Sequence, residues 1–307
     1  MLESRNTAAV TPGARFIDPA ILARIDNLEL IARTVVDGFI SGLHRSPFLG
    51  LSIDFAEHRA YMPGDDIRRI DWRVFARTDR LYVKEFEADT NANFSVILDV
   101  SRSMDFATRG VTKLDYARMI AASLTYMSSR QRDRVGLITF DSDVIDIVPP
   151  SAKHFMTVLH TLDRLAPGKI SDYTQPLRKV AEVIQRKSIL AIISDLYDTP
   201  ERIISAINEL RFRGNDIIVF HILDPAEVDL TFNENSTFQD LETDERLPIA
   251  PDQFRDRYRE LLQQHIATLQ QRLGENRIDY AFFTTSQPLD HVLFQYLSER
   301  ARLTRVR

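Results

Sequence analysis

Apolar residues along the chain follow two spacings, one typical of buried strands and one typical of helices. Short continuous apolar runs, rich in β-branched residues, lie at 94–100, 135–140, 188–194, 216–223 and 278–284. Apolar residues at helical spacing lie between them, at 113–130, 151–165, 176–186, 200–212, 251–273 and 288–300. Strands that alternate with helices predict a doubly wound α/β fold. With 144–148 as an antiparallel edge strand, we expect a six-stranded, mostly parallel sheet between helices.

The residues before this alternation predict an amino-terminal helix and β-hairpin extension. Apolar residues at helical spacing predict a helix over 19–41, and alternation on both sides of Thr78 and Asp79 predicts a hairpin. No flexible linker separates residue 87 from the first buried strand. We therefore divide the chain into residues 1–90, an extension packed on the main domain, and residues 91–307, the main domain. An acidic insertion near 224–250 interrupts the main domain and includes a small hairpin at 238–247.

Composition narrows the classes of function. The 307 residues carry a formal net charge of -5, which argues against a nucleic-acid-binding protein. They include no cysteine, which excludes thiol catalysis and cysteine-ligated metals. No run of about 18 apolar residues is present, as a membrane span would require. Residues 1–20 lack the pattern of a secretory signal. We expect a cytoplasmic protein.

A cluster of oxygen-bearing side chains follows the first buried strand. Asp99, Ser101 and Ser103 alternate at its carboxyl end, where open α/β sheets place their ligands. A carboxylate and two hydroxyls supply oxygen to one side of a hard cation such as Mg²⁺ and leave other coordination positions open. The same residue types also cap turns and helices, which is the structural alternative.

This pattern resembles the metal-ion-dependent adhesion site of von Willebrand factor type A domains. The resemblance implies that a threonine from a second loop and an aspartate from a third complete the site. Thr174, at the start of a predicted helix, and Asp195, directly after a buried strand, match these positions. Mg²⁺ or Mn²⁺ is the implied ion, with Asp195 reaching it directly or through water. Many relatives have glycine after the third-loop aspartate, whereas this chain has Leu196.

A second block, in residues 44–77, is similar to the hallmark of the bacterial family known as domain of unknown function fifty-eight. It includes His44-Arg45-Ser46-Pro47 and the run from Glu57 to Trp72, followed by Ala76-Arg77. Read from the residues alone, its mixture of arginines and carboxylates favours an ion-pair scaffold over a phosphate site. Members of that family are often encoded near MoxR-type AAA+ ATPases. The resemblance therefore implies a MoxR-type ATPase, or its client, as a protein partner.

Three functions fit these observations. The first is a metal-dependent protein-binding module rather than an enzyme, in which an acidic residue of the partner completes the coordination of the ion. The surface around the ion that binds the partner would then include Arg102, Met104, Asp105 and Tyr173. The second is a metal-assisted phosphoester hydrolase built on Asp99 and Asp195 with Asp105 or Asp172. The chain lacks a Gly-rich phosphate loop and a nucleophile with a neighbouring base, which disfavours the hydrolase. The third is a scaffold whose site is vestigial.

Overall fold

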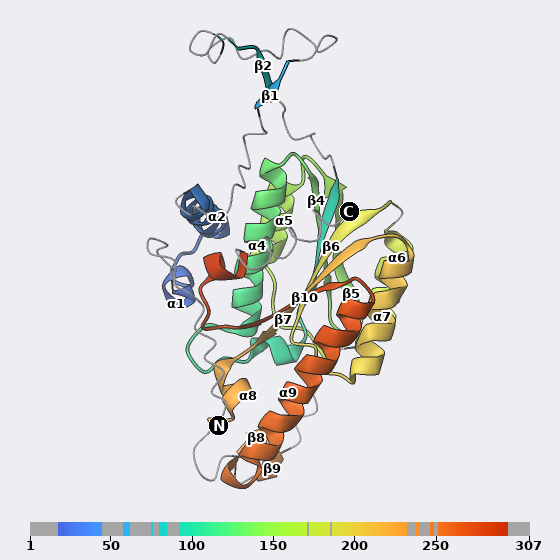
Figure 1. Ribbon diagram of the computed structural model, residues 1–307. Coiled ribbons are helices and arrows are strands. Elements are labelled where there is room, and N and C mark those ends of the chain that lie inside the picture. Colours follow the sequence, from blue (N-terminus) through green and yellow to red (C-terminus); the bar gives the residue numbers. More distant parts are fainter. Residues whose placement is uncertain are drawn as a thin grey trace, which may run out of the picture.

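A six-stranded sheet forms the centre of the computed structural model (Figure 1). Its strands run in the order β10-β7-β6-β3-β4-β5, and only β5 is antiparallel to its neighbour. Their bounds are β3 Asn93–Asp99, β4 Arg134–Phe140, β5 Val144–Ser151, β6 Ser188–Ser194, β7 Asp216–Leu223 and β10 Asp279–Thr284. The structure describes residues 18–44, 58–61, 75, 80–84, 92–170, 172–184, 186–231, 237–239, 246–248 and 251–293. The predicted sheet, with its single antiparallel edge, is confirmed.

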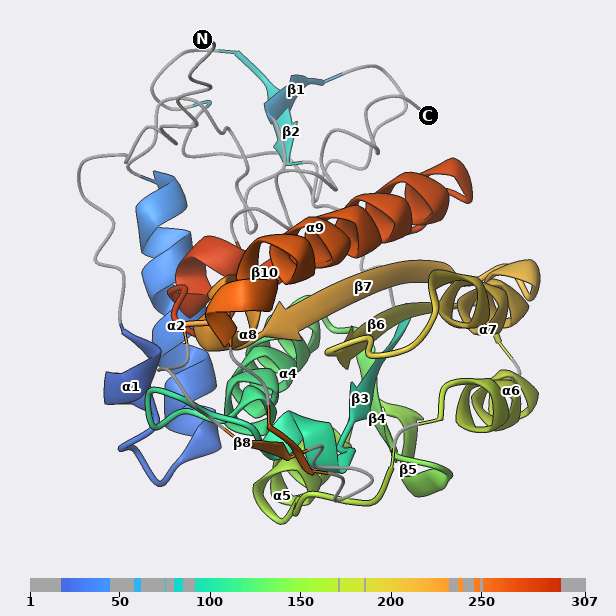
Figure 2. The same ribbon diagram turned by 90° about the horizontal axis from the view of Figure 1, so that it is seen from below.

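Helices cover both faces of the sheet and create two apolar cores (Figure 2). Helix α4 (Lys113–Arg130) and helix α5 (Phe155–Asp163) pack on one face, with α2 against α4. Helices α6 (Thr174–Val183), α7 (Pro200–Phe212) and α9 (Pro251–Glu275) pack on the other. Strand side chains alternate between the faces, so that Val96 and Leu98 join the α4 core while Ile97 joins the α6 core. The central strands are therefore apolar on both sides, as their sequences predict.

The amino-terminal extension differs from the prediction in its helices. Two helices, α1 (Pro19–Leu22) and α2 (Leu28–His44), replace the single helix predicted over 19–41. Asn27 begins the second one, because its side-chain Oδ1 accepts a hydrogen bond from the backbone N–H of Leu30 at 2.8 Å. Apolar spacing continues through this break and hides it in the sequence. Both helices contribute to the core on the α4 side, through residues such as Leu22 and Val35.

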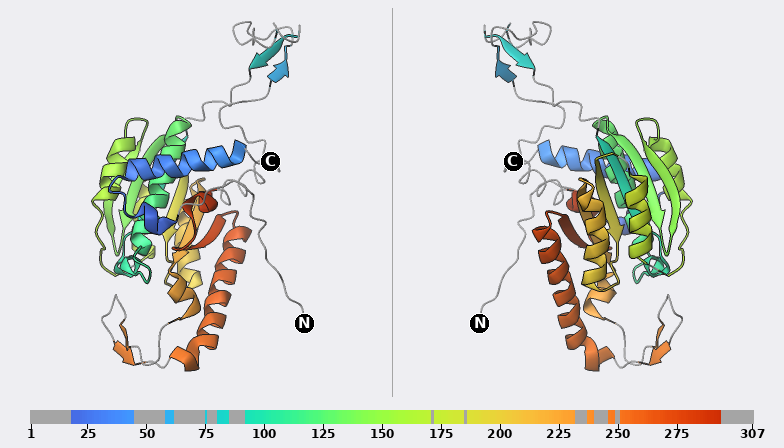
Figure 3. Two further views of the ribbon diagram at one scale, coloured as in Figure 1. Left: turned by 90° about the vertical axis from the view of Figure 1, so that its left-hand side faces the viewer. Right: turned by 90° about the vertical axis from the view of Figure 1, so that its right-hand side faces the viewer.

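The extension contains a short two-stranded sheet. Strand β2 (Tyr82–Lys84) pairs antiparallel with β1 (His58–Ala60). The residues just before Thr78, predicted as the partner in a hairpin, lie almost entirely outside the described residues, so that hairpin stays a prediction. This two-stranded sheet is drawn apart from the central one (Figure 3). Most of residues 45–91 lie outside the described residues, so the packing predicted for that part stays a prediction.

The insertion after β7 contains the expected small hairpin. A short helix, α8 (Pro225–Asp229), is followed by β8 (Thr237–Gln239) and β9 (Arg246–Pro248), which pair antiparallel. The final predicted helix is helical over residues 289–293, and its remainder lies outside the described residues.

Candidate functional site

Three loops meet at the carboxyl edge of the sheet. The first follows β3 and the third follows β6, and these strands are parallel neighbours, so their carboxyl ends lie side by side. The second loop, which leads into α6, is tied to the first by backbone hydrogen bonds from Gly168 N to Val100 O at 2.6 Å and from Arg102 N to Lys169 O at 2.9 Å. The fold thus brings together the three segments predicted to form the metal site.

Asp99 lies at the centre of a buried hydrogen-bond network. Its Oδ1 accepts from the backbone N–H of Ser101 at 2.9 Å. Its Oδ2 accepts from the Ser194 hydroxyl at 2.7 Å and from the Tyr173 hydroxyl at 3.2 Å. The two hydroxyls also lie 2.8 Å from each other. One carboxylate therefore connects all three loops, and Ser194 and Tyr173 are positioning groups that the sequence analysis did not assign to this role.

The remaining predicted ligands lie in the same loops. The hydroxyls of Ser101 and Ser103 are 3.1 Å apart, with Ser103 in the short 3-10 helix η2 (Arg102–Asp105) that follows the buried Ser101. Thr174 is half-buried and is the first residue of α6. Its backbone N–H donates to Asp172 Oδ1 at 2.9 Å, and it directly follows Tyr173, whose hydroxyl contacts Asp99. The five predicted ligands thus come from three loops in contact.

Asp195 is held by a buried lysine that sequence reasoning missed. Lys113, the first residue of α4, is fully buried, and its Nζ lies 2.8 Å from Asp195 Oδ2 and 2.8 Å from Glu227 Oε1. The same ammonium lies 4.9 Å from the ring centroid of Tyr197. Burial lowers the pKa of Lys113, but its two carboxylate partners outweigh burial and raise it overall. Lys113 thus keeps its charge in the interior and fixes the orientation of Asp195.

The same network reaches helix α8. Glu227 Oε2 accepts from the backbone N–H of Asp224, and Asp224 Oδ1 accepts from Ala226 N, so the two acids form a capping box at the start of α8. Asp224 Oδ2 also accepts from the backbone N–H of Thr108, beyond the first loop, at 3.0 Å. The first and third loops are therefore both tied to α8.

The electrostatics of the two aspartates favour a cation. Burial, and then the charge of Asp195, raises the pKa of Asp99 from its ordinary value of 3.8 to about 6, although hydrogen bonds from Ser101 and Ser194 lower it. Asp195 Oδ1 is buried and has no hydrogen-bond partner among the described residues, although such an oxygen normally has one. Hydroxyl and carboxylate oxygens are the ligand types that Mg²⁺ and Mn²⁺ prefer. The residues present therefore fit a divalent ion. Nowhere in the described part of the chain, the predicted site included, do His, Asp and Glu residues gather in threes that could hold a metal, so the site depends on its serine and threonine hydroxyls as further ligands.

The residues predicted to surround the ion divide into two pairs. Arg102 and Asp105 are exposed. Met104 and Tyr173 are 0% and 1% exposed, respectively, so neither side chain lies on the surface where a partner would dock. Met104 belongs to the apolar core on the α4 side of the sheet and Tyr173 to the core on the α6 side, so each side chain packs inward.

Two backbone features hold the loops in place. A Cβ on Gly168 would lie 2.6 Å from Asp141 Oδ2, which accepts from the backbone N–H of Lys169 at 2.8 Å, so the loop requires glycine for this close approach. Leu196 has a φ of 51°, in the left-handed region that favours glycine. Its side chain is buried in the α6 core, which explains how a leucine is retained there.

Fold and loops together define an α/β protein with a predicted oxygen-ligand cation site at the carboxyl edge of its sheet. The chain belongs to the family described as "Protein of unknown function DUF58", whose model matches residues 57–268. It is 30% identical over 257 residues to the uncharacterized protein Rv1480 of Mycobacterium tuberculosis (strain ATCC 25618 / H37Rv), with 79% of each chain covered. The family resemblance predicted from the sequence is confirmed.

Solved structures with similar chains include a conserved hypothetical protein BatB from Bacteroides thetaiotaomicron, with 14% identity, a TM-score of 0.48 and coverage of 69% of this chain and 99% of that one. Another is the SpRpn10 VWA domain, with 13% identity, a TM-score of 0.39 and coverage of 66% and 95%. Within the described residues, no helix has the length and apolar character to cross a membrane.

Proposed function

We propose that this protein is a metal-dependent protein-binding module. Mg²⁺ or Mn²⁺ is held by Asp99, Ser101, Ser103 and Thr174, with Asp195 reaching the ion directly or through water. The observation that carries the proposal is the pair of buried carboxylates, one with a raised pKa and the other with an unpartnered oxygen. A divalent cation offsets the repulsion between the two and supplies the missing partner of Asp195 Oδ1.

The open side of the ion is where the partner docks. Two carboxylates and three hydroxyls leave coordination positions to water, as is usual for Mg²⁺, and an acidic partner side chain replaces one water. The exposed rim then comes from Arg102 and Asp105 rather than from apolar side chains. The family resemblance makes a MoxR-type AAA+ ATPase, or its client, the partner to test first.

The test is complex formation measured with and without metal. The tagged protein is mixed with the candidate ATPase in Mg²⁺ and in chelator, and the variants Asp99→Ala and Thr174→Ala are compared with wild type. Binding that needs Mg²⁺ and is lost in both variants, while circular dichroism shows that both remain folded, supports the proposal. A complex that survives chelator and both substitutions contradicts metal-mediated docking and directs attention to another surface, such as the acidic insertion.

A further inference from the structure

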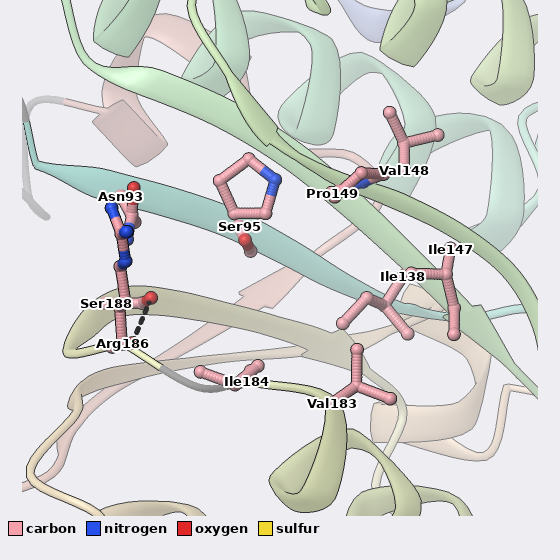
Figure 4. A pocket seen from close by; sticks show the side chains of 11 residues that line it. Asn93, Ser95, Ile138, Ile147, Val148, Pro149, Val183, Ile184, Arg186 and Ser188 are labelled. Carbon is pink, nitrogen blue, oxygen red and sulfur yellow. Dashed lines mark hydrogen bonds between the residues drawn. The ribbon is translucent and has the colours of Figure 1, made fainter.

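We propose that the opposite end of the sheet holds a second binding site, which takes a carboxylate attached to a compact aliphatic group. A pocket of about 290 Å³ lies there, between the strands β3 to β6 and the carboxyl end of α6 (Figure 4). Asn93 and Ser188, the first residues of β3 and β6, line it, whereas the predicted metal site follows the last residues of the same strands. The two sites therefore lie at opposite ends of the sheet.

The pocket exists because strand β3 carries a small polar side chain at this end in place of a large apolar one. On the α6 face of β3, Ile97 belongs to the core, but Ser95, two residues earlier, lines the pocket. Its neighbour across β4 is Gly136, where a Cβ would lie 2.7 Å from the Val148 carbonyl oxygen and 3.1 Å from Ser95 Oγ. Helix α6 ends at Val183. The small Ser95 side chain and the end of the helix leave space that apolar side chains fill elsewhere on this face, whereas Gly136 allows β5 to approach β4 closely.

One end of the pocket is polar. Ser95 is 2% exposed, and among the described residues nothing forms a hydrogen bond with its hydroxyl. Ser95 Oγ is not among the fully buried oxygens of the described residues that lack a partner, so it opens onto the pocket, where a ligand can hydrogen-bond to it. Ser188 is also buried, and Asn93 lies beside it. The Ser188 hydroxyl donates to the backbone carbonyl of Arg186 at 2.8 Å, so the Ser95 hydroxyl and the Asn93 amide are the groups that can donate to an oxygen-bearing ligand.

The same end carries a positive charge. Arg186 is exposed at the pocket's margin, and among the described residues no carboxylate lies within ion-pair distance of its guanidinium. Figure 4 shows the side chains of Arg186, Ser188 and Asn93 at one end of the pocket. A guanidinium beside a hydroxyl and an amide matches a carboxylate, which accepts several hydrogen bonds at once.

The other end is apolar. Ile138, Ile147, Val183 and Ile184 form it, and Ile147 and Val183 are 45% and 46% exposed. A ligand that covers them removes apolar surface from water. The volume lies at the lower limit of the sites that hold drug-sized ligands, so the ligand has few atoms. A branched aliphatic acid fits both ends, and such a group occurs as a free short-chain acid or as the carboxyl-terminal leucine of a protein chain.

Saturation-transfer NMR and calorimetry test the site with 4-methylpentanoate, its neutral analogue 4-methylpentanamide, and N-acetyl-glycyl-leucine. We expect the acid to bind with a dissociation constant of about 1 mM or tighter, and the amide at least about tenfold more weakly, because a charge-assisted hydrogen bond is lost. Tighter binding of the peptide than of the acid identifies a chain terminus as the source, and the reverse identifies a free acid. No binding of either carboxylate, or equal binding of acid and amide, overturns the proposal.

Three variants locate the binding. Arg186→Gln should weaken acid binding at least about tenfold and leave amide binding unchanged, whereas the matched control Arg213→Gln, at the end of α7, should change neither. Ser95→Val fills the pocket with a residue suited to a strand and should abolish binding of both probes while the protein stays folded by circular dichroism. If acid binding persists in Ser95→Val or is equal in Arg186→Gln and wild type, the probe binds elsewhere and the proposal is wrong.

Discussion

Replacing Asp99 with asparagine separates a metal ligand from a structural aspartate, because the two roles predict opposite changes in stability. The pKa of Asp99 is about 6 in the folded protein against an ordinary 3.8. Between these values the folded protein keeps a proton that the unfolded chain has lost, so stability without metal falls as the pH rises through this window. Each pKa unit corresponds to about 1.4 kcal/mol, so the ionised carboxylate costs about 3 kcal/mol above pH 6.

Asp99→Asn removes this cost with little change in shape. The amide oxygen still accepts from Ser101 N, and the amide nitrogen donates to the hydroxyls of Tyr173 and Ser194, which are able to accept. In chelator at about pH 7.5, the variant should therefore unfold at a higher denaturant concentration than wild type, with a gain of about 1–3 kcal/mol in the free energy of unfolding. Mg²⁺ should stabilise wild type, by about 2.7 kcal/mol at a hundred times its dissociation constant, and leave the variant unchanged.

A matched control is available on the next strand. Asp141, also buried after a strand end, accepts hydrogen bonds from the backbone N–H groups of Asp143 and Lys169. Asp141→Asn should destabilise the protein in chelator as well as in Mg²⁺, because it weakens these hydrogen bonds and relieves no buried repulsion. If Asp99→Asn instead lowers stability in chelator and responds to Mg²⁺ as wild type does, Asp99 is a structural residue and the reasoning fails.

Three further predictions follow from the site. Lys113→Met should lower the free energy of unfolding by about 3–5 kcal/mol, because it leaves the buried Asp195 and the half-buried Glu227 without their cation. Adding Glu227→Gln should recover part of the loss in urea denaturation. Equal stability of the single and double variants would exclude the ion pair as the cause. Gly168→Ala should weaken Mg²⁺ binding in calorimetry, since its Cβ would press on the Asp141 carboxylate; an unchanged affinity would show that this contact does not position the loops. The affinity for Mg²⁺ should fall about tenfold per pH unit below about pH 6, because Asp99 takes up a proton there. An Mg²⁺ affinity that does not change between pH 5 and 7 would contradict the role of this carboxylate.

The sequence predicts the sheet well because each central strand is buried on both faces. Runs such as residues 94–100 and 188–194 contain few polar residues, and parallel order follows from the helices between them. The first and third loops of the site are predicted for the same reason, since they follow strand ends, whereas the second loop is predicted from the helix start and from the family resemblance. The break before Leu28 is not predicted, because a side-chain cap from Asn27 interrupts a helical pattern without changing its apolar period.

The interior of the site is predicted less well. Lys113 lies 82 residues from Asp195 and 114 from Glu227, and no spacing in the sequence indicates that these three groups meet. A lysine at the first position of a helix is normally exposed, so its complete burial is visible only in the fold. The burial of Met104 and Tyr173 is missed likewise, because composition does not show which loop side chains turn inward.

Anomalous diffraction from crystals of this protein grown with Mn²⁺ tests the central claim most directly. The account predicts one strong manganese peak at the carboxyl edge of the sheet, within about 2.0–2.3 Å of the oxygens of Asp99, Ser101, Ser103 and Thr174, with Asp195 bound directly or through a water. The peak should disappear in crystals of Asp99→Ala. A manganese peak only at another place, or no peak there at saturating Mn²⁺, would contradict the account.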